Sequence, residues 1–308
     1  MGTPEFAVAS LDALVKAGYN IVGVVTAPDK PAGRGMKMNE SAVKKYAVEH
    51  KLHILQPEKL KNPEFIEELR SLKADLQSVV AFRMLPEIVW NMPPLGTVNV
   101  HGSLLPQYRG AAPINWAVIN GEKETGVTAF KLKHEIDTGD ILLQESFPIG
   151  EDDTTGEVHD HMKEVGAKLL VKTVEGLMNK TLVEKTQSSV VSSESAVLKH
   201  APKIFSETCK IDFSKTVDEV HNLIRGLSPF PGAFTTLHDK MLKIYRSKKE
   251  VTAVQAALSG QTSGEFSTDG KTFLKFACSD GYVQLLEIQL EGKKKMLIED
   301  FLRGYRFS

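Results

Sequence analysis

Gly96-Thr-Val-Asn-Val-His101 is an apolar run that ends in polar side chains, and Gly-Ser-Leu-Leu-Pro follows it at residues 102–106. Further short apolar runs and helical periodicities alternate before it, with runs at 21–26 and 76–82 and helical patterns at 4–16, 41–50 and 63–72. Short apolar runs separated by amphipathic helices are typical of strands buried on both faces of a parallel sheet. The sequence therefore predicts an α/β fold with a doubly wound, mostly parallel sheet.

The pattern of the chain changes after residue 181. Strands at 128–132 and 141–149, followed by a long helix at 154–178 with Thr154 as its cap, complete a first predicted domain, residues 1–181. Residues 182–205 are rich in Ser, Thr, Lys and Glu without periodicity, which is typical of a linker. Residues 206–308 contain one helical pattern and five short alternating runs, at 216–225, 233–237, 242–245, 264–267, 273–277 and 282–288. They predict a small β-barrel, an architecture that commonly binds nucleic acid.

Composition excludes several classes of protein. The chain has 308 residues, 42% of them hydrophobic, a net charge of −1 and two cysteines. No apolar run approaches the roughly 18 to 20 residues of a membrane span, and the first residues suit no signal or transit peptide. Two cysteines build no disulfide framework, so we expect buried thiols and a cytoplasmic setting. Because the chain has no overall basic charge, any contact with nucleic acid must come from local patches.

Cofactor motifs are missing from the sequence. His159 and His161 diverge on the helix expected there, and neither a paired Cys-x-x-Cys nor a Gly-rich phosphate loop occurs. We therefore expect no metal and no nucleotide cofactor.

Asn99 and His101 lie two residues apart at the end of a predicted strand, so both side chains face the same side of the sheet. A doubly wound sheet places its site at the carboxyl ends of its strands. Asp137 begins the turn Asp-Thr-Gly-Asp at 137–140 and could direct its carboxylate toward that strand end. Spacing alone leaves two interpretations open, because an Asn and His pair is often structural and Asp is a routine turn former.

Six motifs, taken in order along the chain, carry a resemblance to a known family. They are Gly2-Thr-Pro-Glu-Phe-Ala7, Asp29-Lys-Pro-Ala-Gly-Arg-Gly35, Asn99-Val-His-Gly-Ser-Leu-Leu-Pro106, Tyr108-Arg-Gly-Ala-Ala-Pro113, Asp137-Thr-Gly-Asp140 and Gly292-Lys-Lys-Lys-Met296. Together they resemble the methionyl-tRNA formyltransferase family. The resemblance implies a Rossmann-like formyltransferase domain, an OB-like barrel, and transfer of a formyl group from 10-formyltetrahydrofolate to initiator methionyl-tRNA by a monomer.

The resemblance also implies which residues form the site. The expected catalytic residues are Asn99, His101 and Asp137. The expected folate-binding residues are Phe82, Arg83, Met84, Leu85, Ser103, Leu104, Leu105, Pro106 and Asp140. The expected tRNA-binding residues are Lys30, Arg34, Lys37, Arg109, Lys293, Lys294 and Lys295.

The chemistry of these groups agrees with such a reaction. An α-amine with a pKa of about 7.7 to 8.0 is readily neutral near pH 7, so no covalent enzyme nucleophile is needed. Asn99 and protonated His101 can donate hydrogen bonds to the formyl oxygen as it becomes negative. Asp137 either holds His101 charged or relays the proton of the amine, and the sequence leaves both roles open. Ser103 lacks a nucleophile elbow and is better interpreted as a loop or helix cap.

One departure from the family and two competing functions stay open at this point. Relatives place an apolar strand directly before the motif that starts here at Gly2, so we expect Met1 to be an internal methionine of a longer chain, with a genuinely shortened protein as the alternative. The main competing enzyme is a folate-dependent formyltransferase for a small amine or a sugar nucleotide. The alternative from another class is a catalytically silent module that binds RNA or folate.

Overall fold

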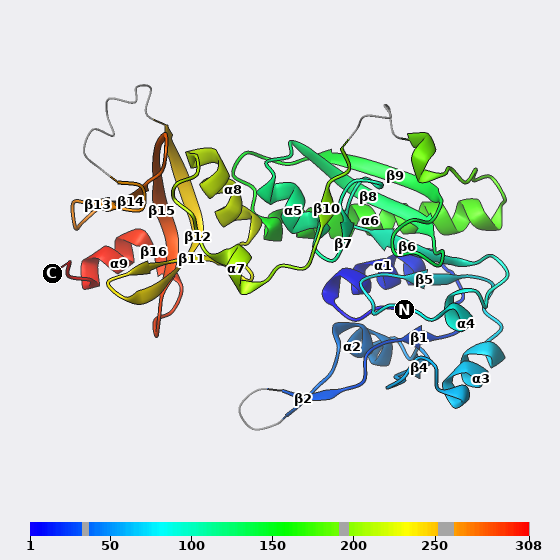
Figure 1. Cartoon of the computed structure of the whole chain (residues 1–308). Helices are drawn as coiled ribbons and strands as arrows, with labels where there is room; N and C mark the ends of the chain where they lie inside the picture. Colours follow the sequence, from blue (N-terminus) through cyan, green and yellow to red (C-terminus); the bar gives the residue numbers. More distant parts are fainter. Residues whose placement is uncertain (33–36, 191–196, 252–261, 308) are drawn as a thin grey trace. The chain divides into compact units, whose positions relative to one another are not determined.

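The computed structural model describes residues 1–32, 37–190, 197–251 and 262–307. The chain forms two compact units, shown in Figure 1. Unit 1 contains residues 1–110, 126–147 and 160–199, and unit 2 contains residues 111–125, 148–159 and 200–308. Residues 111–125 and 148–159, which the sequence places in the first predicted domain, thus make their contacts within unit 2. The domain boundaries at 181 and 206 stay a prediction.

Unit 1 alternates helices and short strands, as the sequence predicts. Its helices are α1 (Glu5–Lys16), α2 (Ala42–Glu49), α3 (Pro63–Ser71), α4 (Glu87–Trp90), the 3₁₀ turn η1 (Gln187–Val190) and most of α6 (Thr155–Met178). Its strands are β1 (Val24–Val25), β2 (Lys30–Ala32), β3 (Lys37–Asn39), β4 (Ile54–Leu55), β5 (Gln77–Val79), β6 (Thr97–His101), β7 (Arg109–Gly110), β8 (Glu124–Lys131) and β9 (Ile141–Pro148). The helix starts follow local chemistry: the side chains of Ser41 and Asn62 cap α2 and α3.

The sheet of unit 1 combines parallel and antiparallel pairs of strands. β5 and β6 pair in parallel, β6 pairs with β8 in antiparallel fashion, and β9 lies beside β8. A second parallel pair consists of β1 and β4. Helix α6 packs on one face of the sheet, because a Cβ on Gly166 would lie 3.4 Å from Cγ1 of Val100. The predicted α/β fold is confirmed, and Asn99 and His101 face away from Val100 because side chains alternate along β6.

The first two residues join the two parallel pairs. The N–H of Gly2 donates to the carbonyl of Val25 over 3.1 Å, and the N–H of Val80 donates to the carbonyl of Met1 over 2.9 Å. Met1 and Gly2 therefore extend between β1 and β5. The amino group of Met1 donates to the carbonyl of Ser78 over 2.6 Å, and burial lowers its pKa from 8.0 to about 5.

Unit 2 is built on a curled antiparallel sheet. Its strands run in the order β11 (Ala233–Leu237), β12 (Lys240–Val251), β15 (Gly281–Leu290), β14 (Leu274–Ala277) and β13 (Phe266–Thr268), and β16 (Met296–Leu297) pairs with β15. The other elements are α5 (Pro113–Ile119), β10 (His200–Ala201), α7 (Ser206–Cys209), α8 (Val217–Gly226) and α9 (Ile298–Gly304). The five predicted strands and the barrel-like architecture are confirmed.

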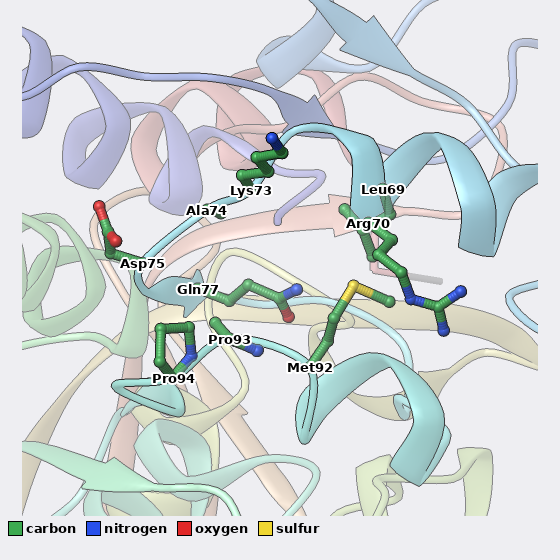
Figure 2. Close-up of a pocket in the computed structure, with 9 residues that line it drawn as sticks. All are labelled: Leu69, Arg70, Lys73, Ala74, Asp75, Gln77, Met92, Pro93 and Pro94. Atoms are coloured by element: carbon green, nitrogen blue, oxygen red, sulfur yellow. The ribbon is translucent and has the colours of Figure 1, made fainter.

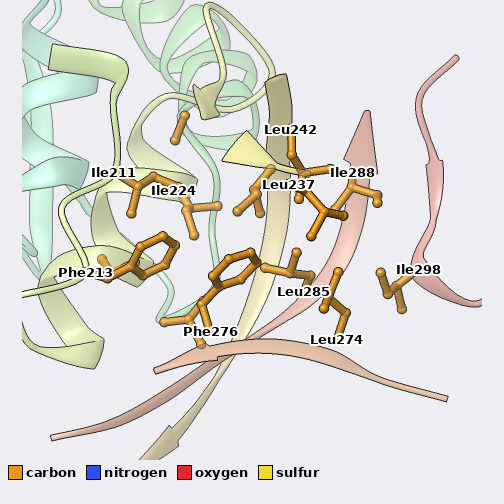
Figure 3. Packing of buried hydrophobic residues seen from close by; sticks show 14 of the residues in the cluster. Ile211, Phe213, Ile224, Leu237, Leu242, Leu274, Phe276, Leu285, Ile288 and Ile298 are labelled. Carbon is orange, nitrogen blue, oxygen red and sulfur yellow. The ribbon is translucent and has the colours of Figure 1, made fainter. Parts of the chain in front are cut away.

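An apolar cluster fills the concave side of this sheet. Figure 3 shows Ile224 from α8 facing Leu242, Leu285 and Phe276 from the strands. Thr216 starts α8 with a capping box, in which its side chain accepts from the N–H of Glu219 and the Glu219 carboxylate accepts from the N–H of Thr216. Because Ile224 belongs to the cluster, burial of apolar surface holds α8 on the sheet. In the described residues, no helix is long and apolar enough to cross a membrane.

Candidate functional site

Asn99 and His101 project from the last residues of β6, on the face of the sheet opposite to α6. His101 is 8% exposed and Asn99 is half-buried. Among the described residues, the side-chain amide of Asn99 has no hydrogen-bond partner. Its donor is therefore available to a bound substrate.

The imidazole of His101 lies between two fixed oxygen atoms. Its Nε2 lies 2.9 Å from the carbonyl oxygen of Tyr108, and its Nδ1 lies 3.9 Å from Oδ2 of Asp137. A carbonyl oxygen can only accept a hydrogen bond, so Nε2 carries a hydrogen and donates a hydrogen bond to the carbonyl of Tyr108. The opposite edge of the ring faces a carboxylate, an arrangement complementary to a positively charged imidazolium.

Asp137 lies in the loop between β8 and β9. Its φ of 54° falls in the left-handed region, which Asp tolerates better than most residues. The N–H of Gly110 donates to Oδ2 of Asp137 over 3.1 Å. Two residues further on, a Cβ on Gly139 would lie 1.6 Å from the carbonyl oxygen of Lys131, so this position requires glycine. The loop thus brings Asp137 to His101, as the sequence predicts, through a constrained backbone.

Gln187 fixes the same loop from another side, and sequence reasoning missed it. The residue is 5% exposed, in η1. Its Nε2 donates to the carbonyls of Asp137 and Gly139, over 2.8 and 2.9 Å. Its Oε1 accepts from Nε and Nη2 of Arg109, over 3.0 and 2.5 Å. A single Gln in a segment rich in Ser and Thr gives no signal of this role.

Residues 102–107 form a hydrogen-bonded loop beside His101. Ser103 Oγ donates to the carbonyl of Gln107 over 2.6 Å, which is a loop-closing contact. Thr128 Oγ1 donates to the carbonyl of Ser103 and accepts from the N–H of Leu105, over 2.6 and 3.0 Å. Gln144 Nε2 donates to the carbonyl of Leu105 over 2.9 Å. Thr128 and Gln144 are therefore further supports of the site that the sequence gave no reason to select.

The other residues predicted to bind folate have distinct environments. Phe82 and Leu85 pack on one apolar cluster, and Leu105 is buried in another. Met84 is 72% exposed, while the guanidinium of Arg83 donates to the backbone carbonyls of Pro57 and Glu58. The remaining contacts are an ion pair of 2.7 Å between Asp140 and Lys133, and close packing of the Leu104 side chain on Gly126. Pro106 directly precedes Gln107, the residue that accepts from Ser103.

The cationic residues predicted to bind tRNA lie in both units. In unit 1, Lys30 is exposed in β2, which pairs with β3, the strand that begins at Lys37. Arg34 lies outside the described residues. Arg109 donates to Gln187.

In unit 2, Lys293 and Lys294 are exposed in the turn between β15 and β16. Lys295 follows them, 2.9 Å from the Glu287 carboxylate, with its Nζ 4.9 Å from the centroid of the Tyr245 ring. Two of the three adjacent lysines thus extend into solvent.

A pocket of about 230 Å³ lies elsewhere in unit 1, as Figure 2 shows. Its lining residues are Leu69, Arg70, Lys73, Ala74, Asp75, Gln77, Met92, Pro93 and Pro94. Gln77 begins β5 and pairs with Thr97 at the start of β6, whereas Asn99 and His101 end β6. The pocket therefore lies at the amino ends of the parallel strands, away from the candidate site. Within the described ranges, no three His, Cys, Asp or Glu residues are grouped as metal ligands.

Comparison with known proteins places the chain in a family. The formyl transferase family matches residues 1–174, and the formyl transferase C-terminal domain family matches residues 203–306. Methionyl-tRNA formyltransferases of Phocaeicola vulgatus and Bacteroides fragilis are 54% and 52% identical to this chain. Both matches cover all of this chain, and they cover 95% and 94% of the respective relative. The chain belongs to the methionyl-tRNA formyltransferase family. The Flavobacterium johnsoniae member of this family is 46% identical over the whole chain and 96% of its own length.

Solved structures share the fold at much lower identity. The N-formyltransferase of Helicobacter canadensis, in complex with folinic acid and dTDP-3-aminofucose, has a TM-score of 0.67 and 22% identity over 96% of this chain and 97% of its own. The sugar 3N-formyl transferase WlaRD, crystallised with dTDP and 5-N-formyl-THF, has a TM-score of 0.66 and 22% identity over 95% and 97%. These likenesses show that this chain shares their fold, and they show nothing about its substrate.

Proposed function

We propose that this protein transfers the formyl group of 10-formyltetrahydrofolate to the α-amino group of initiator methionyl-tRNA, in the cytoplasm, for translation initiation. One observation carries the proposal: Asp137 lies 3.9 Å from His101, which is on the strand that also carries Asn99, in a chain about 52% identical to relatives named for this activity. An amide and an imidazole can donate hydrogen bonds to the oxygen that becomes negative in an acyl transfer, and a carboxylate can stabilise the charged imidazole.

The reaction begins when the neutral α-amine attacks the formyl carbon. A new C–N bond forms, the carbonyl oxygen becomes negative, and the amine nitrogen carries a positive charge until it loses a proton. The bond from the formyl carbon to N10 of the folate then breaks, and N10 leaves with the electron pair and gains a proton. Asn99 Nδ2 and the Nδ1 edge of His101 donate to the negative oxygen, because Nε2 of His101 is already committed to Tyr108.

Asp137 supports this step from the same edge of the imidazole, the one that carries Nδ1. Its carboxylate lies 3.9 Å from Nδ1 of His101, so it stabilises the charged ring and lies within reach of a proton shed by the amine through one water. The N–H of Gly110 fixes the orientation of the carboxylate. Proton relay and stabilisation of the imidazolium are therefore compatible roles of one group.

The folate is proposed to lie against residues 82–85 and 103–106, with Asp140 at its edge. Related folds have been crystallised with folinic acid and with 5-N-formyl-THF, which supports a folate cosubstrate. The tRNA is proposed to contact Lys30, Arg34, Lys37, Arg109 and residues 293–295, with a monomer as the active species. Lys and Arg supply most nucleic-acid affinity through phosphate contacts.

A formyltransferase for sugar nucleotides is the competing function. The structures with TM-scores of 0.66 and 0.67 include such enzymes, but at 22% identity they support only the fold. Identities of 46% to 54% over the whole chain favour methionyl-tRNA as the acceptor.

The test is transfer of radiolabelled formyl from 10-formyltetrahydrofolate to charged initiator tRNA, with elongator methionyl-tRNA, free methionine and an amino-sugar nucleotide as parallel acceptors. We expect product only on the initiator tRNA, and its loss in Asp137→Asn. Formylation of the sugar nucleotide in place of the tRNA would refute the proposed acceptor, and loss of formyl to water in every reaction would indicate a hydrolase.

A further inference from the structure

We infer that Gln187 is a positioning residue for the reaction, which holds the Asp137 loop and the residues 108–110 in register around His101. This inference rests on the proposed function, since it concerns how Asp137 and His101 are placed. Gln187 touches no reacting atom in the arrangement described; it acts through the two segments that it joins.

The first step of the argument is how completely the Gln187 side chain is used. Its Nε2 gives both of its hydrogens to main-chain carbonyls, those of Asp137 and Gly139. Its Oε1 accepts two hydrogen bonds from the guanidinium of Arg109. An amide has two donor hydrogens and one oxygen with two lone pairs, so its capacity is fully satisfied.

The second step is that both partner segments face His101. On one side, Asp137 places its carboxylate 3.9 Å from Nδ1. On the other side, Arg109 lies between Tyr108, whose carbonyl lies 2.9 Å from Nε2, and Gly110, whose N–H donates to the Asp137 carboxylate. Gln187 therefore connects the segment that fixes one edge of the imidazole to the segment that faces the other edge.

The third step is that the loop needs an external support. Asp137 has a φ of 54° and Tyr108 a φ of 58°, values that cost a non-glycine residue free energy and persist when surrounding contacts impose them. Gln187 is 5% exposed, so its hydrogen bonds are shielded from water. A displacement of about 1 Å at a catalytic group can lower a rate by about 100-fold, which makes such a support significant for turnover.

The substitution Gln187→Glu separates the two halves of this contact. It has nearly the same shape and still accepts from Arg109, but an ionised carboxylate cannot donate to the two carbonyls. We expect kcat for formyl transfer to fall by roughly 10- to 100-fold near pH 7.5, with the KM values for folate and tRNA close to those of the wild type. The ratio of variant to wild-type kcat should rise as the pH is lowered toward 5, because protonation of the introduced carboxyl group restores one donor.

Two further variants guard against trivial explanations. Gln187→Met keeps the volume but has no donor at any pH, so its kcat should be low throughout without recovery at acidic pH. Ser188→Ala is the matched control in the same turn, since its exposed hydroxyl pairs, among the residues that the structure describes, only with Thr186, 3.2 Å away. Its kcat and thermal unfolding should equal those of the wild type.

A double-mutant cycle with Asp137→Asn decides whether Gln187 acts through Asp137. If it does, Gln187→Glu should reduce kcat far less in the Asp137→Asn background than in the wild type. The inference is overturned if Asp137→Asn collapses kcat while Gln187→Glu and Gln187→Met stay within twofold of the wild type, or if the two losses are additive. If Asp137→Asn itself keeps wild-type kcat, the proposed function of Asp137 has failed, and that result differs from either of these.

Discussion

The site around His101 and the apolar cluster of unit 2 are stabilised in opposite ways. Around His101, buried polar side chains such as those of Gln187 and Thr128 donate hydrogen bonds to main-chain carbonyls of other segments. In unit 2, side chains such as Phe276 and Leu285, at most 2% exposed, pack against one another without polar partners. In the first region a residue can be lost with little change in buried area but a large change in geometry. In the second region, loss of an apolar side chain lowers the free energy of unfolding.

The largest effect should come from opening the apolar cluster of unit 2. Phe276 is 2% exposed and stacks on Phe213 with ring centroids 4.8 Å apart, so Phe276→Ala leaves a cavity. We expect a loss of about 3 to 5 kcal/mol in the free energy of unfolding, measured by denaturant titration. Leu297→Ala is the control, because Leu297 is 56% exposed, and its change should stay within about 0.5 kcal/mol. A stability unchanged by Phe276→Ala would contradict the packing described.

The second effect should be almost purely catalytic. Asn99→Ala removes the donor proposed for the formyl oxygen, so kcat should fall by about 10²- to 10³-fold, or roughly 2.7 to 4 kcal/mol of transition-state stabilisation. The free energy of unfolding should barely change, because this amide has no hydrogen-bond partner within the described part of the chain. Asn179→Ala, at an exposed position after α6, is the matched control. Equal kcat in the two variants would remove Asn99 from the mechanism.

The contrast between apolar packing and hydrogen bonds to main-chain atoms also explains which features the sequence could predict. Alternating apolar residues mark strands directly, and the predicted runs 233–237 and 273–277 match β11 and β14 closely. Periodicity also placed α1, α3 and α6, whose buried faces are long enough to show it. Short elements such as α9 and the hairpin of β2 and β3 escaped prediction, because a few residues carry too little pattern.

For the site, Asn99, His101 and Asp137 were selected by spacing and by resemblance, and the structure brings Asp137 within 3.9 Å of His101, which is on the strand that also carries Asn99. Gln187 and Gln144 could not be found this way. Their role depends on contacts between segments 50 and 39 residues apart, with Asp137 and Leu105, and a hydrogen bond to a main-chain carbonyl leaves no trace in the sequence of the acceptor. Gln187 lies in the segment 182–205, which its composition led us to interpret as a linker. That composition gave no sign of the contacts that Gln187 makes with the rest of unit 1.

A smaller effect is expected from the lysines at 293–295. Replacing all three by Ala should raise KM for tRNA modestly at low salt, and the difference from the wild type should shrink as salt increases, because each lost phosphate contact reduces the salt dependence. Lys295 should contribute least, since it is already paired with Glu287 at 2.9 Å. Lys180→Ala, at another exposed position, controls for general charge. A KM difference that persists undiminished at high salt would argue against phosphate contacts.

The smallest effect is a pH dependence of stability within unit 2, carried by His221. This residue is 2% exposed; its Nδ1 lies 3.0 Å from Ser247 Oγ, and its Nε2 lies 3.3 Å from the exposed carboxylate of Asp152. Burial, with the positive charges of Arg225 and Lys249, lowers the pKa of His221 below 6.5, although Asp152 opposes this shift.

The direction of the effect follows from which state takes up the proton. The unfolded chain protonates this histidine as the pH falls through about 6.5, whereas the native state resists protonation until a lower pH. The stability that His221 contributes is therefore complete above pH 6.5 and declines below it. We expect the melting temperature of His221→Gln to fall less than that of the wild type between pH 7.5 and 5.5. If the wild type instead gains stability relative to the variant over this range, the ion pair with Asp152 outweighs burial, and His221 would be a charged anchor for residues 150–153.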